Sequence, residues 1–103
     1  MEGAKQNFVF APGIFAQTTW DERKRLLNID KHGIDFKDAV AALTEPHLEM
    51  SSNRHGEIRT LAVCRQTKRL ISVVYTFRGD VLRIISARAV RKNEQRAFED
   101  LFG

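Results

Sequence analysis

The sequence predicts an α+β fold, because its hydrophobic pattern changes period along the chain. Before Pro46 the apolar residues recur at the 3.6-residue spacing of helices, and after it they form short runs rich in Ile, Val, Leu and Thr that are typical of strands. The C-terminal segment returns to helical spacing. Segregated helices and strands in a chain of 103 residues indicate a single α+β domain.

Two helices are expected in the first half of the chain. Thr19 and Glu22 match a capping box, so the first helix should begin after Thr19 and run to His32. Gly33 should then take the left-handed position that ends the helix, and Asp35 should cap a second one. The inner face of the second helix would consist of Phe36, Ala39, Val40 and Leu43.

The remaining elements are strands and one helix. Strand-like runs are expected at residues 48–50, 57–65, 69–77 and 81–87, after a short strand at 14–19. Residues 66–68 and 78–80 are connections so short that the strands they join must be antiparallel. A final helix should follow from Val90 onward. Residues 1–13 are expected to form a flexible N-terminal extension, and residues 14–103 the single domain.

Composition narrows the function classes. Hydrophobic residues make up 43% and charged residues 29% of the chain, which is a globular balance. A long apolar run and a signal peptide are both missing, so a cytoplasmic location is expected. The single cysteine, Cys64, stands in an apolar run and is expected in the core. A net charge of +4 favours a polyanionic partner, either nucleic acid or an acidic protein.

The residues left to carry chemistry are cations around the sheet. The three histidines lack the spacing of a metal site, and there is no glycine-rich phosphate loop, so neither a metal nor a cofactor is expected. An arginine on a strand can bind a phosphate with its planar fork, or it can protect a sheet edge or pair with a carboxylate. The candidates are Arg59, Arg83 and Arg88 on the sheet, Lys24, Lys31 and His32 on the first helix, and Arg91, Lys92 and Arg96 on the last.

Three residues, namely Lys31, His32 and Tyr75, allow both a structural and a functional interpretation. Lys31 and His32 would offset the dipole in the last turn of the helix, or they would transfer protons in a site. Tyr75, the only tyrosine, would lie in the core with its hydroxyl at the surface, or it would stack on a base. The sequence leaves both alternatives open.

Several short motifs, taken in order, resemble one known family. They are Trp20-Asp21, Lys24, Asn28, Lys31-His32-Gly33, Val74-Tyr75-Thr76, Arg78-Gly79, Arg83-Ile84-Ile85-Ser86-Ala87-Arg88 and Glu94. In order and spacing these residues resemble the BrnT family of bacterial toxins from toxin–antitoxin pairs, over roughly residues 18–99. Three positions depart from the family: Arg91 where Ser or Thr is frequent, Phe77 where an acidic residue is frequent, and Phe98 where Tyr is frequent.

The resemblance implies a compact RelE-like domain that cleaves RNA without a metal and inhibits translation when free. It also implies a cognate antitoxin that binds operator DNA through a ribbon-helix-helix region, with a toxin–antitoxin heterotetramer as one assembly. In such a site Arg59, Arg83 and Arg88 would stabilise charge, and Lys31 and His32 would transfer protons. Tyr75, Lys24, Arg91, Lys92 and Arg96 would bind the RNA.

Two alternatives to this activity remain. The chain could be a non-catalytic module of the same fold that binds RNA or an acidic protein. It could also be an unrelated nucleic-acid-binding domain.

Overall fold

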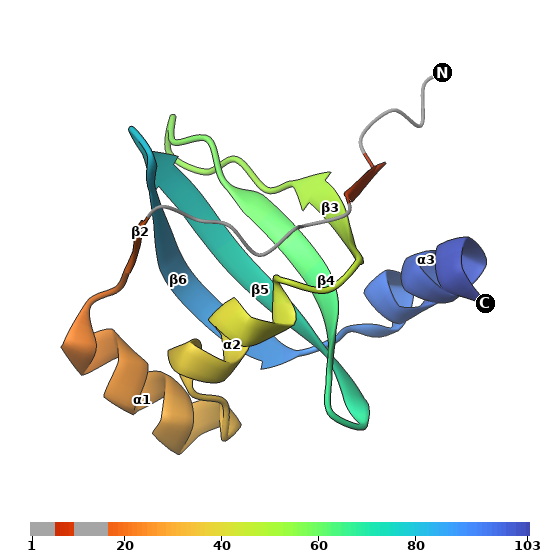
Figure 1. The fold of residues 1–103 in the computed structure, drawn as a ribbon, viewed down its shortest axis with the longest axis horizontal. Coiled ribbons are helices and arrows are strands. Elements are labelled where there is room, and N and C mark those ends of the chain that lie inside the picture. Colours follow the sequence, from red (N-terminus) through yellow and green to blue (C-terminus); the bar gives the residue numbers. More distant parts are fainter. Residues whose placement is uncertain (1–5, 10–16) are drawn as a thin grey trace.

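The computed structural model describes residues 6–9 and 17–103, and their backbone forms a six-stranded sheet with three helices. The order of strands across the sheet is β1-β3-β4-β5-β6-β2 (Figure 1). In chain order the elements are β1 (Gln6–Val9), β2 (Gln17–Thr19), α1 (Glu22–His32), α2 (Phe36–Ala42), β3 (His47–Ser51), β4 (Thr60–Gln66), β5 (Arg69–Arg78), β6 (Val81–Ala89) and α3 (Lys92–Phe102). The α+β class is confirmed. The expectation of a wholly antiparallel sheet is wrong, because β2 pairs in parallel with β6 and the sheet is mixed.

The centre of the sheet is the antiparallel meander that the short connections predict. Strands β3 to β6 pair antiparallel with their neighbours in sequence. The two tight loops need positive φ angles, which Thr67 (φ 55°) and Gly79 (φ 62°) supply. Strand β4 begins at Thr60 rather than at Glu57 as expected, because residues 54–57 close a separate turn. A bulge between Val74 and Tyr75 shifts the register against β6.

The outer strands come from the N-terminal part of the chain. Strand β2 pairs in parallel with β6 and covers the second half of the predicted strand at 14–19, whose first residues lie outside the described ones. Strand β1 pairs antiparallel with β3. It lies within the range 1–13 that the sequence assigns to an extension, and residues 1–5 and 10–13 of that range lie outside the described residues.

Helix α1 begins two residues later than its capping box predicts. Asp21 is the N-cap, and its Oδ1 accepts a hydrogen bond from the Lys24 amide at 3.2 Å. The box from Thr19 is therefore wrong, since Thr19 is the last residue of β2 and Glu22 instead binds Arg25. The C-terminal prediction is confirmed, because Gly33 is left-handed (φ 69°) and donates to the Ile29 carbonyl at 2.8 Å.

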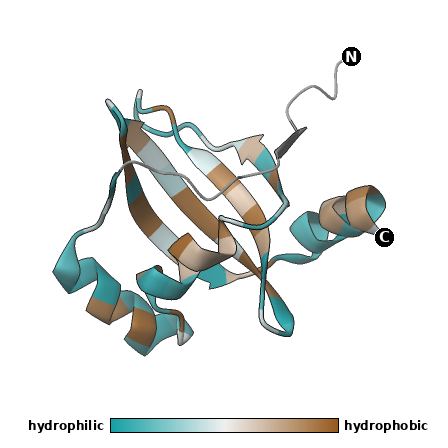
Figure 2. Cartoon of the chain, viewed as in Figure 1, coloured by the Kyte–Doolittle hydropathy of each residue, from teal (hydrophilic) through white to brown (hydrophobic). Residues whose placement is uncertain are grey.

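Helices α1 and α2 cover one face of the sheet and α3 covers part of the other (Figure 1). Asp35 caps α2 as predicted, by accepting from the Lys37 amide at 3.0 Å. Phe36, Ala39 and Leu43 of its inner face are fully buried against strands β4, β5 and β6. Figure 2 shows hydrophobic positions along these central strands and hydrophilic ones over most of α1.

On the opposite face, α3 packs against β3 and β4. Phe98 is buried there with Leu48, Leu61 and Val63. Arginine has no acceptor for a cap, so only half of a capping box forms at the start of α3: the Glu94 side chain accepts from the Arg91 amide at 2.9 Å.

Candidate functional site

Two of the predicted arginines lie on one face of the sheet, near the start of β6. Arg83 on β6 stands opposite Thr76 on β5, and facing residues of paired strands share a face. The Thr76 hydroxyl donates to the carbonyl oxygen of Ile58 at 2.7 Å, which holds the segment that carries Arg59 against β5. Arg59 and Arg83 are both half-buried, and both act on the carboxylate of Glu57.

The Glu57 carboxylate is surrounded by positive charge. Its Oε1 accepts from Arg59 Nε at 2.7 Å, and its Oε2 lies 3.9 Å from a terminal guanidinium nitrogen of Arg78. The hydrogen bond from Arg59 and the charges of Arg78 and Arg83 lower the pKa of Glu57. Two guanidinium groups thus pair with one carboxylate and the charge of a third acts on it, so that surplus positive charge is available to an anion. Arg59, Arg78 and Arg83 with Glu57 are called the arginine cluster below.

A tight turn presents Glu57 to these arginines. The backbones of Arg54 and Glu57 exchange hydrogen bonds of 3.0 and 2.8 Å around His55 and Gly56. Both central residues have positive φ angles, 52° for His55 and 77° for Gly56, as in the turns that match the twist of paired strands. This turn at residues 54–57 fixes one wall of the arginine cluster.

Arg88, the third predicted arginine, is held by a carboxylate. Its two terminal nitrogens donate to Glu94 Oε1 and Oε2 at 2.9 and 2.8 Å, and the Glu94 side chain is 5% exposed. Glu94 also accepts from the Ser72 hydroxyl at 2.7 Å. Burial raises the pKa of Glu94, but the hydrogen bonds from Arg88, the Arg91 amide and Ser72 lower it overall to about 2. The planar fork of Arg88 is therefore committed to joining β6 to α3.

The predicted cations of α1 line a groove beside β6. Its lining consists of Lys24, Leu27, Asn28, Asp30, Lys31 and His32 of α1 with Ile85 and Ser86 of β6. Lys24 and Lys31 are exposed and His32 is half-buried. The structure thus brings together three residues that the sequence singles out, and adds the apolar side chains of Leu27 and Ile85 to the lining. This surface is called the α1–β6 groove below.

Asn28 fixes the position of α1 against the edge of β6. Its side-chain nitrogen donates to the carbonyls of Ile34 and Ala87, both at 2.8 Å, and its Oδ1 accepts from the Ala87 amide at 3.2 Å. The buried amide thus pairs with a strand edge as a neighbouring strand would. Sequence reasoning quoted Asn28 only among the residues of the family resemblance and gave it no structural role, because its neighbours at helical spacing, Lys24, Arg25, Lys31 and His32, are also polar.

The arginine cluster and the α1–β6 groove lie at neighbouring positions of one strand. Arg83 and Ser86 are three residues apart on β6, a separation of about 10 Å. Both surfaces carry more cations than carboxylates: three arginines with Glu57 in one, and Lys24 and Lys31 with Asp30 in the other. An extended polyanion along β6 would meet both.

The aromatic residue predicted to bind RNA is buried. Tyr75 is 5% exposed, and its hydroxyl donates to Glu49 at 2.7 Å, so its ring offers no open face. Burial and the contact with Glu49 raise the pKa of Tyr75. Beside it lies the ring of Phe77, which is 52% exposed and packs edge-on against Tyr75 with centroids 5.7 Å apart. Phe77 stands one residue before Arg78 of the arginine cluster, and sequence reasoning noted it only as a departure from the family.

The predicted cations of the last helix lie apart from these surfaces. Arg91, Lys92 and Arg96 are exposed at the start of α3. Helix α3 packs against β3 and β4, whereas α1 packs against β6 at the other side of the sheet (Figure 1). The structure does not bring these three residues to the α1–β6 groove.

The part of the chain that the structure describes has no group of three or more His, Cys, Asp or Glu residues that could hold a metal. Cys64 is fully buried, and this burial raises the pKa of its thiol. Among the described helices, none combines the length and the apolar composition needed to cross a bilayer.

Comparison with known proteins identifies one family. A family model described as the ribonuclease toxin BrnT of type II toxin–antitoxin systems matches residues 20–94. The matched range includes the arginine cluster, the α1–β6 groove and the Arg88–Glu94 pair, and leaves out Arg96. No curated protein shows a significant match to the chain.

Proposed function

The chain belongs to the BrnT family of ribonuclease toxins of type II toxin–antitoxin systems, and from this premise we propose that it cleaves RNA without a metal ion. The observation that carries the proposal is the arginine cluster, in which Arg59 and Arg78 pair with Glu57 while the charge of Arg83 has no carboxylate partner of its own among the described residues, beside a second cationic groove. The alternative is that the chain is a non-catalytic module of the same fold, which binds RNA or an acidic protein.

Cleavage without a metal uses the ribose as its own nucleophile. The 2′-oxygen attacks the adjacent phosphorus while its proton passes to a base. The bond from phosphorus to the 5′-oxygen then breaks, and that oxygen receives a proton. The products are a 2′,3′-cyclic phosphate and a 5′-hydroxyl. A protein that accelerates this reaction needs a charge stabiliser for the phosphoryl oxygens and groups for both proton transfers.

The arginine cluster supplies the charge stabiliser. Arg83 is the best placed of the predicted arginines, because it joins no ion pair with a carboxylate of the described residues and lies half-buried, where its charge is less screened. Arg59 would take part by exchanging Glu57 for the phosphate. Arg88 can reach a phosphate only after it leaves Glu94, so its contribution to charge stabilisation ranks below that of the other two.

The α1–β6 groove supplies the proton-transfer groups. His32 carries an imidazole ring, whose two nitrogens suit it to accept and to donate a proton, and Lys31 is an exposed cation beside it. Lys24 would contact a backbone phosphate at the other side of the groove. Because Tyr75 is buried, the exposed ring of Phe77 takes over the proposed stacking on a base.

The partner proposed for the chain is a ribbon-helix-helix antitoxin that carries the operator-DNA contacts of the complex. The chain's net charge of +4 suits an acidic segment of that antitoxin, which would cover Arg83 and the neighbouring cations and so block cleavage. A heterotetramer is the assembly we propose, and Arg91, Lys92 and Arg96 would then contact RNA only in the free toxin. When free, the toxin would cleave cytoplasmic RNA and inhibit translation.

The experiment that tests this function uses the purified chain and a defined RNA. We expect cleavage that EDTA does not suppress, with a cyclic phosphate on the 3′ end of the upstream product. The assay is run with and without ribosomes, because some RNA sites are accessible only in translation. RNA binding without cleavage under both conditions would favour the non-catalytic alternative, and loss of cleavage in EDTA would contradict the metal-independent mechanism.

A further inference from the structure

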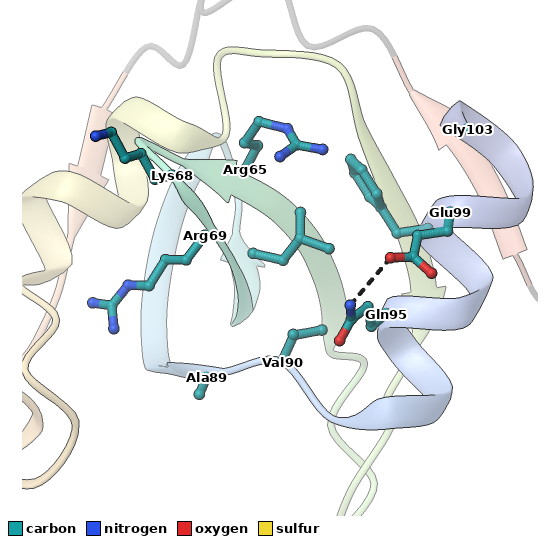
Figure 3. Close-up of a pocket in the computed structure, with 10 residues that line it drawn as sticks. Arg65, Lys68, Arg69, Ala89, Val90, Gln95, Glu99 and Gly103 are labelled. Carbon is teal, nitrogen blue, oxygen red and sulfur yellow. Dashed lines mark hydrogen bonds between the residues drawn. The ribbon is translucent and has the colours of Figure 1, made fainter.

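A second groove lies between α3 and the hairpin that joins β4 to β5 (Figure 3). Its volume is about 420 Å³. The hairpin side is formed by Arg65, Lys68, Arg69 and Leu70, and the helix side by Gln95, Phe98, Glu99 and Gly103, with Ala89 and Val90 between them. A neighbouring hollow shares Arg65 and Phe98 with it, so the concave surface continues around Arg65. This surface is called the α3–hairpin groove.

The cations of the α3–hairpin groove lack carboxylate partners, among the described residues, of the kind that Arg25 and Arg88 have. No carboxylate of the described residues forms an ion pair with Arg65, Lys68 or Arg69, whereas Arg25 and Arg88 are both paired. The one carboxylate in the groove, that of Glu99, already accepts from Gln95 at 3.1 Å (Figure 3). Arg69 donates only long hydrogen bonds to neutral oxygens, to Gln66 at 3.4 Å and to the Gly33 carbonyl at 3.5 Å. Three cations therefore face one carboxylate in this groove.

The floor of the α3–hairpin groove is aliphatic. Leu70 and Val90 are half-buried at its centre, and Phe98 is only 4% exposed. The Arg65 guanidinium already lies over the Phe98 ring, 5.5 Å from its centroid. Within the lining of this groove a base would find no open aromatic face, because the exposed ring nearby, that of Phe102 (36%), belongs to the neighbouring hollow, whereas an aliphatic side chain would find an apolar floor. The combination of an apolar floor and a cationic rim fits a peptide better than RNA.

We propose that the α3–hairpin groove binds an acidic segment of the partner antitoxin, anchored by at least one aliphatic side chain on Leu70 and Val90. This rests on the proposed function, because it assumes that the partner is a protein antitoxin. The groove lies far from the arginine cluster, since Ala89 and Arg83 are six residues apart on β6, or about 20 Å. One part of the antitoxin is thus held at α3 while another covers the RNA site.

The test compares two double variants of the full chain with matched changes in charge. Arg65→Glu/Lys68→Glu reverses two cations of the groove, and Arg23→Glu/Lys37→Glu reverses two exposed cations of α1 and α2 outside it. The probe is the purified antitoxin, taken as the product of the reading frame directly downstream of the gene for this chain. We expect the groove variant to bind it at least tenfold more weakly, mainly through slower association and with a smaller salt dependence, while the control changes binding much less.

Two further variants keep the test decisive. Lys68→Glu/Arg69→Glu leaves the Arg65–Phe98 contact intact, so it serves if the first variant folds poorly. Val90→Thr keeps the side-chain volume but replaces a methyl group of the floor by a hydroxyl. It should weaken binding of the antitoxin several-fold without changing the charge. RNA cleavage by the free variants should equal that of the unchanged chain.

Equal binding by the groove variant and the control would overturn the proposal. Loss of RNA binding with unchanged antitoxin binding would also overturn it and would assign the groove to RNA. If the unchanged chain does not cleave RNA, the proposed function fails, whereas weaker antitoxin binding by the groove variants would still support this inference.

Discussion

Arg88 and Glu94 are joined by two parallel hydrogen bonds of 2.9 and 2.8 Å that tie the end of β6 to the first turn of α3. Glu94 also accepts from Ser72 on β5 and from the Arg91 amide, so one buried carboxylate connects two strands and a helix. A structural role explains this arginine fully, whereas Arg83 has no comparable partner among the described residues. The two arginines should therefore respond differently to mutation.

Arg88→Ala should destabilise the fold strongly, because it leaves the buried Glu94 carboxylate without its cation. Breaking a buried pair from one side costs roughly 3–5 kcal/mol. The double variant Arg88→Ala/Glu94→Gln should lose less than the sum of the two single changes, since it leaves no unpaired charge. Urea denaturation measures each free energy of unfolding, and an unchanged midpoint for Arg88→Ala would show that the pair contributes nothing.

The stability of the fold should fall in acid because of Glu94. Its pKa is about 2 in the folded protein, against an ordinary value of 4.5, so its contribution is fully present above about pH 4.5. That contribution, on the order of 3 kcal/mol, is lost as the pH falls from 4.5 towards 2. Glu49 acts in the same direction, since burial raises its pKa but hydrogen bonds from His47 and Tyr75 lower it overall. Denaturation of Glu94→Gln at several pH values should give a flatter profile, and an identical slope would argue against this assignment.

Gly33→Ala should destabilise the protein by roughly 1 kcal/mol through backbone conformation alone. Gly33 has a φ of 69°, and a Cβ atom added there would meet no other atom within 4 Å. Gly33→Asn is the matched control, because asparagine tolerates the left-handed region better and should lose less. Thermal unfolding of both variants provides the comparison, with equal losses as the unexpected result.

Tyr75→Phe and Phe77→Ala should separate core packing from RNA binding. Tyr75→Phe removes the hydroxyl that Glu49 accepts from, so it should lower stability while RNA affinity stays unchanged. Phe77→Ala removes a half-exposed ring, and if that ring stacks on a base the affinity should fall by about 1–3 kcal/mol. Fluorescence anisotropy with a short single-stranded RNA reports the affinity, and equal binding by Phe77→Ala would exclude stacking there.

The fold could be predicted largely because its signals are local. The change of period at Pro46, the cap at Asp35 and the left-handed Gly33 depend on neighbouring residues, and the structure confirms each. The start of α1 was misplaced because Thr19 and Asp21 are both good N-caps, and pairing of β2 with β6 decides between them. That parallel pairing joins segments far apart in sequence, so no local pattern could indicate it.

The site was predictable as a set of residue types but not as a geometry. The sequence singled out Lys24, Lys31 and His32, and the structure places them in one groove. The sequence could not show that Arg88 has a structural role and Arg83 does not. The two differ in that Arg88 pairs with Glu94, and the position of Glu94 in the sequence also suits a helix cap. Nor could the sequence assign a role to Asn28, because its hydrogen-bond partner Ala87 is 59 residues away.

The central claim is that the arginine cluster stabilises the transition state of RNA cleavage, and the rate of Arg83→Ala tests it most directly. Single-turnover cleavage of a defined RNA by purified proteins, with and without ribosomes, should be slower by roughly 10²–10³-fold, while RNA affinity and the folding midpoint change little. Arg83→Lys should be nearly as slow, because lysine lacks the planar fork, and Arg23→Ala should cleave normally. Full activity of Arg83→Ala would contradict the claim, as would a loss of RNA affinity that by itself accounts for the slower cleavage.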